Sequence, residues 1–157
     1  MQKIINPYKG DKDYNCFACS PHNPIGLHME FWEDGEELIC KWNPQKRFEG
    51  YSDMLHGGIQ STLIDEMGAW AVHVKGGTTG VTRKLNIKYR KPVPIEKGEI
   101  TLRANYEKIR SQLANIYVDL LNNDEEIASE GELMYFLYSE EEARENFNYP
   151  GIDAFYE

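Results

Sequence analysis

The sequence lacks a surplus of basic residues, a long apolar run and a dense set of cysteines. Its 157 residues hold 17 Lys and Arg against 26 Asp and Glu, for a net charge of −9. This balance argues against nucleic acid as a partner, because such binding depends on neutralising phosphates. No run approaches the roughly 18 consecutive apolar residues of a membrane-spanning helix, so we expect no membrane partner.

Other absences limit the chemistry and the compartment. The sequence has no phosphate-binding loop, no dinucleotide fingerprint and no Gly-x-Ser-x-Gly elbow, and we expect no cofactor. Three cysteines are too few, and odd in number, for a disulfide framework. Residues 1–7 lack the apolar segment of a secretory signal. We therefore expect the protein to be cytoplasmic.

The length suits one domain, which we take to be residues 1–157. Residues 1–26 are rich in Pro, Gly, Asn and Asp and predict an irregular leader. Residues 139–157 carry six acidic residues and one arginine, which indicates an acidic C-terminal tail with a short helix near residues 140–147.

Hydrophobic periodicity predicts the order of the remaining elements. Alternating apolar residues at 27–32 and 38–42, on the two sides of Asp34-Gly35, predict a hairpin. A helical period runs from Gly57 to Gly76-Gly77. The further expected strands are residues 81–89, 100–106, 112–121 and 126–138. The predicted class is α+β, with one antiparallel sheet of about six strands and one long helix. A helix only about 10–12 Å wide cannot cover such a sheet, so we expect a second copy to cover part of it.

The predicted helix has an unusual polar face. Its core face carries the large apolar residues, and Asp65 lies almost opposite, among small residues. Small neighbours let a ligand or another backbone approach, so Asp65 could line a cleft formed with a partner chain. The alternative is an exposed acid on a short helix. Glu66 lies nearer the core boundary and is either structural or a second acid.

The start of the helix is also unusual. His56-Gly57-Gly58 places two glycines in the first turn, where backbone N–H groups lack partners within the helix and carry partial positive charge. Glycines allow a carbonyl oxygen to approach these groups, as in a backbone oxyanion site. The alternative is a plain flexible turn.

Several motifs carry a resemblance to a known family. They are Cys16-Phe17-Ala18-Cys19, Asn23-Pro24-Ile25-Gly26-Leu27, Phe48-Glu49-Gly50-Tyr51, His56-Gly57-Gly58 with Asp65, and the strand from Val81 to Pro92. In this arrangement the chain resembles the hotdog-fold acyl-CoA thioesterases of the phenylacetate-pathway (PaaI) type over about residues 16–138. The resemblance implies a sheet wrapped around one central helix. It also implies a homodimer with a continuous sheet and sites at the interface, and leaves open a dimer of dimers (a homotetramer).

The resemblance also implies roles for individual residues. Asp65 would be the catalytic carboxylate, acting as general base or as nucleophile. The N–H of Gly58, with Gly57 beside it, would hold the thioester oxygen, and His56 would orient the turn or the substrate. Thr82 matches a position where a hydroxyl helps to place the water.

Two features depart from the family pattern. Some members carry an amide side chain shortly before His-Gly-Gly, whereas residues 49–55 contain none. This absence would either weaken catalysis or shift the duty to Ser52 or Asp53. Strand alternation also places Thr82 on the face opposite Leu85 and Ile87, so that it reaches the site only if that part of the strand faces the partner subunit.

The expected function is hydrolysis of an acyl-CoA to a free acid and CoA. The alternatives are a non-hydrolytic binding module for acyl-CoA or a small ligand and, more weakly, a hotdog dehydratase. Basic residues of the strand after the helix could bind the CoA phosphates. The expected substrate-binding residues are Glu66, Arg83, Lys84, Arg90 and Lys91.

Cys16, Cys19 and His22, with His28 beyond, suggest a zinc site at first sight. The set has no second cysteine pair at regular spacing, which strong zinc signals require. We therefore expect no metal and interpret the cysteines as small buried residues. His73, near the end of the helix, is expected to be structural.

Overall fold

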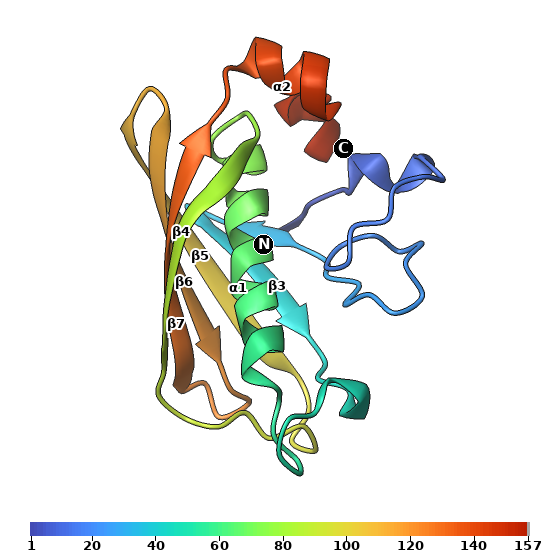
Figure 1. Cartoon of the computed structure of the whole chain (residues 1–157), viewed down its shortest axis with the longest axis vertical. Helices are drawn as coiled ribbons and strands as arrows, with labels where there is room; N and C mark the ends of the chain where they lie inside the picture. Colours follow the sequence, from blue (N-terminus) through green and yellow to red (C-terminus); the bar gives the residue numbers. More distant parts are fainter. Residues whose placement is uncertain (157) are drawn as a thin grey trace.

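The sheet and one long helix form the body of the chain. The computed structural model describes residues 1–156 (Figure 1). The helices are α1 (Gly57–Val74) and α2 (Glu140–Phe147), with short 3-10 turns at Pro7–Gly10, Lys46–Phe48 and Ile152–Phe155. The strands are β1 (Gln2–Lys3), β2 (Trp32–Asp34), β3 (Glu37–Trp42), β4 (Gly80–Tyr89), β5 (Ile100–Arg110), β6 (Leu113–Leu121) and β7 (Ile127–Leu137). All pairs are antiparallel, in the order β1-β2-β3-β5-β6-β7-β4.

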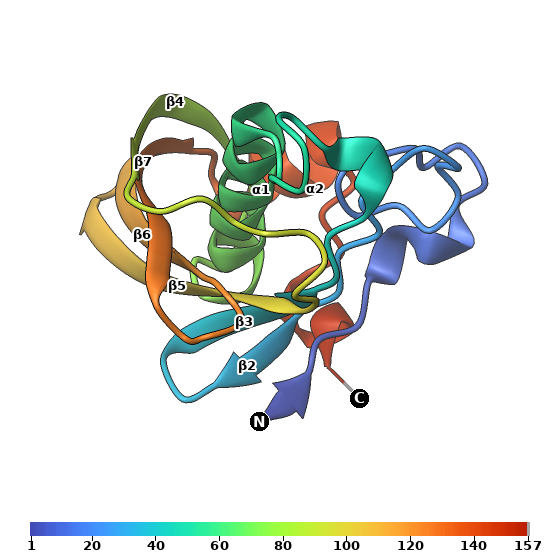
Figure 2. The same cartoon turned by 90° about the horizontal axis from the view of Figure 1, so that it is seen from below.

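The sheet curves around α1, as Figures 1 and 2 show from two sides. Close contact is possible because the sheet presents a glycine to the helix: a Cβ on Gly131 would lie 2.4 Å from Ile64 Cγ2. Leu63, Met67 and Trp70 of α1 are fully buried or nearly so. The predicted α+β class and the antiparallel sheet around one long helix are confirmed. The sheet has seven strands rather than about six, because the leader contributes β1.

The leader covers the side of α1 that faces away from the sheet (Figures 1 and 2). Phe31 stacks on Trp70 with ring centroids 4.4 Å apart, and Met29 N–H donates to Ala18 O at 2.9 Å. Residues 27–31 keep the predicted alternation of burial, but only Trp32–Asp34 pair as a strand. The first hairpin strand is therefore shorter than predicted, because residues 27 and 29 bond to the leader instead of to β3.

A β-bulge in β4 overturns one expectation about Thr82. Thr82 pairs with Tyr135 and Lys84 with Met134, so Arg83 is an extra residue in the strand. The bulge shifts the alternation by one position. Thr82 therefore shares the helix-facing side of the sheet with Leu85, whereas regular alternation placed the two on opposite faces. The prediction was wrong because periodicity assumes an unbroken ladder.

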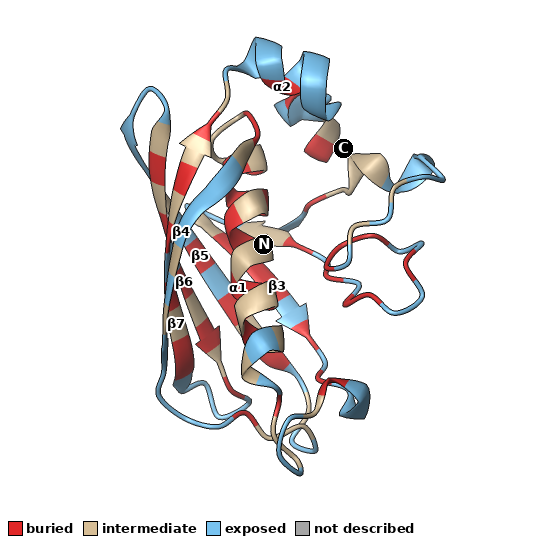
Figure 3. Cartoon of the chain, in the orientation of Figure 1, coloured by how far each residue is buried: buried red, intermediate tan, exposed pale blue. Residues whose placement is uncertain are grey.

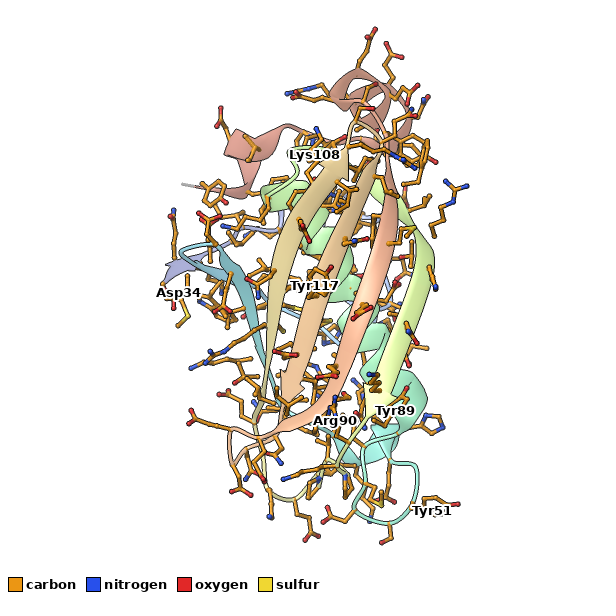
Figure 4. All side chains as sticks on the ribbon, turned by 90° about the vertical axis from the view of Figure 1, so that its left-hand side faces the viewer. Asp34, Tyr51, Tyr89, Arg90, Lys108 and Tyr117 are labelled. Atoms are coloured by element: carbon orange, nitrogen blue, oxygen red, sulfur yellow. The ribbon has the colours of Figure 1, made fainter. Side chains whose placement is uncertain are left out.

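The outer face of the sheet is polar at its centre. Tyr117 stands on this face, as Figure 4 shows, and is 42% exposed. Asp119, Glu130 and Glu132 lie around it. The centre of this face therefore offers little apolar surface to a covering subunit. The exposed surface left for a second copy is instead strand β4, which forms one edge of the sheet (Figure 3).

The end of the chain packs on the C-terminal end of α1. The predicted short helix is present as α2, capped by Ser139, whose Oγ accepts from Glu142 N at 3.2 Å. Tyr149 Oη donates to His73 O at 2.9 Å. Glu157, the last acid of the predicted tail, lies outside the described residues. No helix within residues 1–156 combines the length and the apolar character needed to cross a membrane.

Candidate active site

The first turn of α1 is capped by an imidazole. His56 Nδ1 accepts the Gly58 N–H at 2.9 Å, and His56 O accepts from the Ile59 and Gln60 amides. Gly57 N–H has no hydrogen-bond acceptor among residues 1–156. The free donor at this helix N-terminus is therefore Gly57. Gly58, which the sequence singled out first, becomes available only when the imidazole leaves its amide.

Tyr89, at the end of β4, stands beside the same turn. Its hydroxyl donates to Gly57 O at 2.8 Å and lies 2.7 Å from Ser61 Oγ. The Tyr89 ring is also what a Cβ on Gly57 would meet first, at 3.5 Å. This contact could not be predicted from the sequence, because 32 residues separate the two positions.

A cavity opens at this end of the molecule. Its volume is about 710 Å³, and its lining includes His56 and Gly57 from the helix start, Tyr51 from the preceding loop, and Tyr89. Gly58 is not in the lining. Figure 4 shows Tyr51, Tyr89 and Arg90 at this same end of the molecule. The free amide of Gly57 therefore borders a space that a small ligand could enter.

Asp65 lies two turns further along the helix and is half-buried. Thr82 Oγ1 donates to Asp65 Oδ1 at 2.7 Å, and Tyr135 Oη donates to the Asp65 carbonyl oxygen at 3.4 Å. The contact with Thr82 exists because of the bulge at Arg83. Not all of the small residues around Asp65 lie at the surface. Gly68 is buried against the sheet, and a Cβ there would lie 2.7 Å from Leu133 Cδ2.

Asp65 and Gly57 of one chain are too far apart to act on one bond. Eight residues of α-helix rise about 12 Å. Groups that hold a carbonyl oxygen and activate the attacking water must each lie about 3 Å from the reacting atoms. The two predicted halves of the site therefore belong to separate places on a single copy of the chain.

The predicted basic residues fall into two groups. Arg90 and Lys91 line the cavity, where Arg90 pairs with Glu130 at 2.6 Å and Lys91 pairs with Glu126. Arg83 and Lys84 lie on exposed β4 beside Thr82 and have no ion pair within the described part of the chain. Charge near the cavity is thus partly neutralised, whereas β4 keeps free positive charge.

Glu66 does not join these residues. Its Oε1 accepts from Trp70 Nε1 at 3.0 Å and lies 3.5 Å from Cys16 Sγ, on the side of α1 that the leader covers. It lines a different cavity from His56 and Gly57. The structure therefore separates Glu66 from the expected substrate site.

The loop before the helix has no free amide side chain either in sequence or in space. Asp53, with φ of 57°, accepts from Glu96 N at 2.8 Å through Oδ1 and is tied to the loop. An unforeseen amide, Gln60, lines the cavity. Its Nε2 donates to Leu55 O at 3.3 Å and its Oε1 accepts from Ser129 Oγ at 2.9 Å. Gln60 could have been found from the sequence, because it is a polar residue on the predicted core face of the helix.

Comparisons with known proteins identify the fold. The sequence model described as "Thioesterase superfamily" matches residues 53–129. Acyl-coenzyme A thioesterase 13 of Mus musculus is 34% identical over 88 residues, covering 55% of this chain and 62% of that protein. The chain thus matches less than two thirds of that relative's length.

Two solved structures extend the comparison. Zebrafish thioesterase superfamily member 2 has a TM-score of 0.67 and 23% identity, over 83% of this chain and 93% of that one. The smu.793 protein of Streptococcus mutans, solved bound to acetyl-CoA, has a TM-score of 0.65 and 16% identity, over 71% of this chain and 90% of that one. The hotdog fold is confirmed, whereas the phenylacetate-pathway subtype stays a prediction.

Proposed function

We propose that the chain hydrolyses the thioester bond of an acyl-CoA, a proposal supported by its match to the thioesterase superfamily model over residues 53–129. The observation that carries the proposal is the pair of features on α1. One is a carboxylate, Asp65, held by the Thr82 hydroxyl. The other is a free amide, Gly57 N–H, bordering a cavity. A base and an oxyanion donor are the two groups that attack on a thioester carbonyl requires.

The separation of these groups supports a site shared between two copies. The roughly 12 Å rise between Gly57 and Asp65 is too long for one carbonyl, so we propose that Gly57 of one copy faces Asp65 of the other. The exposed edge of β4, beside Thr82, is where the second copy would extend the sheet. An unpaired strand edge of ten residues is a ready template for such pairing. A further pairing of dimers stays open.

The proposed reaction is a two-step acyl transfer to water. The thioester oxygen accepts the Gly57 N–H, and Asp65 takes a proton from the water that attacks the carbonyl carbon. The tetrahedral intermediate then collapses, its C–S bond breaks, and the CoA sulfur leaves with its electron pair and receives a proton. In the alternative form Asp65 attacks the carbonyl itself, and water cleaves the resulting anhydride.

The residues around the site have supporting roles. Thr82 donates to Asp65 Oδ1, which leaves Oδ2 free to meet the water. His56 caps the turn and fixes the Gly57 amide in the first turn. Arg83 and Lys84, which lack acidic partners within residues 1–156, are the cations best placed for CoA phosphates near Asp65, and Arg90 and Lys91 would act from the cavity rim.

The test is a panel of short, medium, long and aromatic acyl-CoAs with a free-thiol readout. Asp65→Asn should lower kcat by about 10²–10⁴-fold, the usual contribution of a general base, and more if Asp65 is the nucleophile. Asp13→Asn, on the exposed leader, is the matched control and should keep full activity. A folded Asp65→Asn protein with unchanged turnover would remove Asp65 from the mechanism.

A non-hydrolytic binding module is the second candidate. The observation that favours it is the loop of residues 49–55, which offers no free amide, while the Gln60 amide is already bonded at both ends. Binding of acyl-CoA without release of thiol from any member of the panel would support this candidate against hydrolysis.

A further inference from the structure

The leader brings two cysteines against a carboxylate of α1, on the side of the helix away from the proposed thioester site. Cys16 Sγ and Cys19 Sγ lie 3.0 Å apart, and Cys16 Sγ lies 3.5 Å from Glu66 Oε1. One donor atom from each of the three residues falls within 4.8 Å of the others. Two thiols and a carboxyl group therefore converge on one point between the leader and the helix.

The backbone around the cysteines favours a thiolate at Cys16, whereas the hydrogen bond with Cys16 and burial raise the pKa of the Cys19 thiol. Ser20 N–H donates to Cys16 O at 3.1 Å and closes a tight turn over residues 16–20. Cys16 Sγ accepts from Cys19 N–H at 3.3 Å and also from the Ala18 N–H. The hydrogen bond from Cys19 and these amides lower the pKa of the Cys16 thiol to about 5. The thiolate is the form of cysteine that binds metal ions.

Within residues 1–156, no lysine or arginine forms a salt bridge with Glu66. A cavity of about 460 Å³ lies beside the cluster, and its lining includes Tyr14, Ala69 and Trp70 but no lysine or arginine. Burial raises the pKa of Glu66 to about 8. Without an ion, Glu66 therefore keeps its proton near neutral pH, and a bound cation would take the place of that proton. The cluster thus has the donors of a cation site and lacks a protein cation of its own.

We propose that Cys16, Cys19 and Glu66 bind a divalent cation of the zinc class, with water in the fourth position. Zinc takes thiolate sulfur and carboxylate oxygen together in tetrahedral geometry. Zn–S bonds of about 2.3 Å and Zn–O bonds of about 2.1 Å place sulfur and oxygen about 3.6 Å apart, and two sulfurs about 3.8 Å apart. The distance from Cys16 to Glu66 already fits, and the two sulfurs need to separate by less than about 1 Å.

The ligand set differs from the one that sequence spacing suggested. His22 Nε2 bonds to Lys9 O at 2.6 Å, and His28 Nε2 bonds to Asn23 O at 2.5 Å. The third donor comes instead from α1, 47 residues after Cys19. An ion here would fasten the leader to the central helix and so stabilise the layer that covers Trp70.

A disulfide between Cys16 and Cys19 is the competing state. It would require the sulfurs to close from 3.0 Å to about 2.05 Å. A disulfide does not explain why the buried carboxyl group of Glu66 faces the two cysteines, whereas a bound cation uses all three donors. The two states also give different results in one experiment, since only the metal site takes up an ion under reducing conditions.

The experiment is titration of the reduced, chelator-treated full chain with Co²⁺ and then Zn²⁺. We expect one ion per chain, a thiolate-to-cobalt charge-transfer band, the visible spectrum of a tetrahedral ion, and displacement of cobalt by zinc. Zn²⁺ should also raise the Tm. Outer-shell partners alone are worth about 10–100-fold in metal affinity, so Glu66→Gln is expected to cost at least that much.

Variants separate this site from adventitious binding. Cys16→Ser and Cys19→Ser should each abolish the charge-transfer band, and circular dichroism checks that they fold. Cys40→Ala, at a fully buried cysteine of β3 outside the cluster, is the matched control and should keep the band. The proposal is overturned if the double Cys16→Ser/Cys19→Ser variant keeps the spectrum. Unchanged affinity in Glu66→Gln contradicts the three-ligand site. The proposal is also overturned if the reduced protein takes up no ion and oxidised glutathione instead produces a disulfide between Cys16 and Cys19.

Discussion

Replacing Gly131 with alanine tests how closely the helix approaches the sheet. The added Cβ would lie 2.4 Å from Ile64 Cγ2, whereas carbon atoms in contact lie about 3.5–4.0 Å apart. Overpacking of a well-packed core costs about 1–3 kcal/mol. Alanine recovers about 0.5–1 kcal/mol because a glycine inside a strand is itself unfavourable. We therefore expect Gly131→Ala to lower the free energy of unfolding by about 1–2 kcal/mol.

A second substitution identifies the clashing atom. Ile64→Ala removes Cγ2 and leaves a cavity, which by itself costs about 2–5 kcal/mol. In the double variant Gly131→Ala/Ile64→Ala the new methyl group occupies vacated space. The double variant should therefore be more stable than the sum of the two single effects predicts, by about 1–3 kcal/mol.

The assay is urea unfolding at one fixed protein concentration, with free energies from linear extrapolation. Gly10→Ala is the matched control, because a Cβ on Gly10 meets nothing within 4 Å, and it should change stability by less than about 0.5 kcal/mol. A neutral Gly131→Ala variant, or effects that add within about 0.5 kcal/mol in the double variant, would refute the packing argument.

Two further predictions concern Thr82 and His73. Thr82→Val removes the hydrogen bond to Asp65 and should lower kcat by about tenfold, which corresponds to a loss of about 1.4 kcal/mol. Thr82→Ser keeps the hydroxyl and should keep most of the activity. Equal activity of the two variants would contradict the role of the hydroxyl. Burial lowers the pKa of His73 from 6.5 to about 4, so the folded state resists a proton that the unfolded state accepts. The free energy of unfolding should therefore fall by up to about 3 kcal/mol as the pH drops from 6.5 to 4. His73→Gln should remove this loss, whereas His22→Gln should not. Identical pH profiles of the wild type and His73→Gln would contradict the role of His73.

Periodicity was sufficient for the helix and for the order of the elements. The helix spans Gly57–Val74, where apolar spacing and the Gly76-Gly77 stop placed it. The same periodicity placed Asp65 away from the core face, and the structure leaves it half-buried beside Thr82. These features follow from local spacing along one element, which the sequence displays directly.

Features that depend on contacts between distant segments could not be predicted. The bulge at Arg83 shifts the ladder by one residue and reverses the face of Thr82, and nothing in the residue types marks it. Glu66 was expected among the substrate-binding residues, but neighbouring helix residues such as Asp65 and Glu66 point about 100° apart. The fold of the leader over α1 decides what Glu66 meets, and that fold leaves no periodic pattern in residues 1–26.

The capping of Gly58 belongs to the same class. The sequence indicated two glycine amides at the helix start but could not show which one a side chain would fill. His56 Nδ1 accepts the Gly58 N–H, which leaves the Gly57 N–H as the free donor. This changes which glycine should be altered to test the oxyanion site.

The shared thioester site is tested most directly by complementation between two inactive variants. Asp65→Asn removes the carboxylate, and Gly57→Val places methyl groups against Tyr89 at the free amide. Each variant alone should be inactive towards acyl-CoA. In an equal, co-expressed mixture about half of the dimers combine the two variants and contain one intact site, so activity should return to about a quarter of the wild-type value. A mixture as inactive as its components, although mass spectrometry shows mixed dimers, would contradict a site built from two copies.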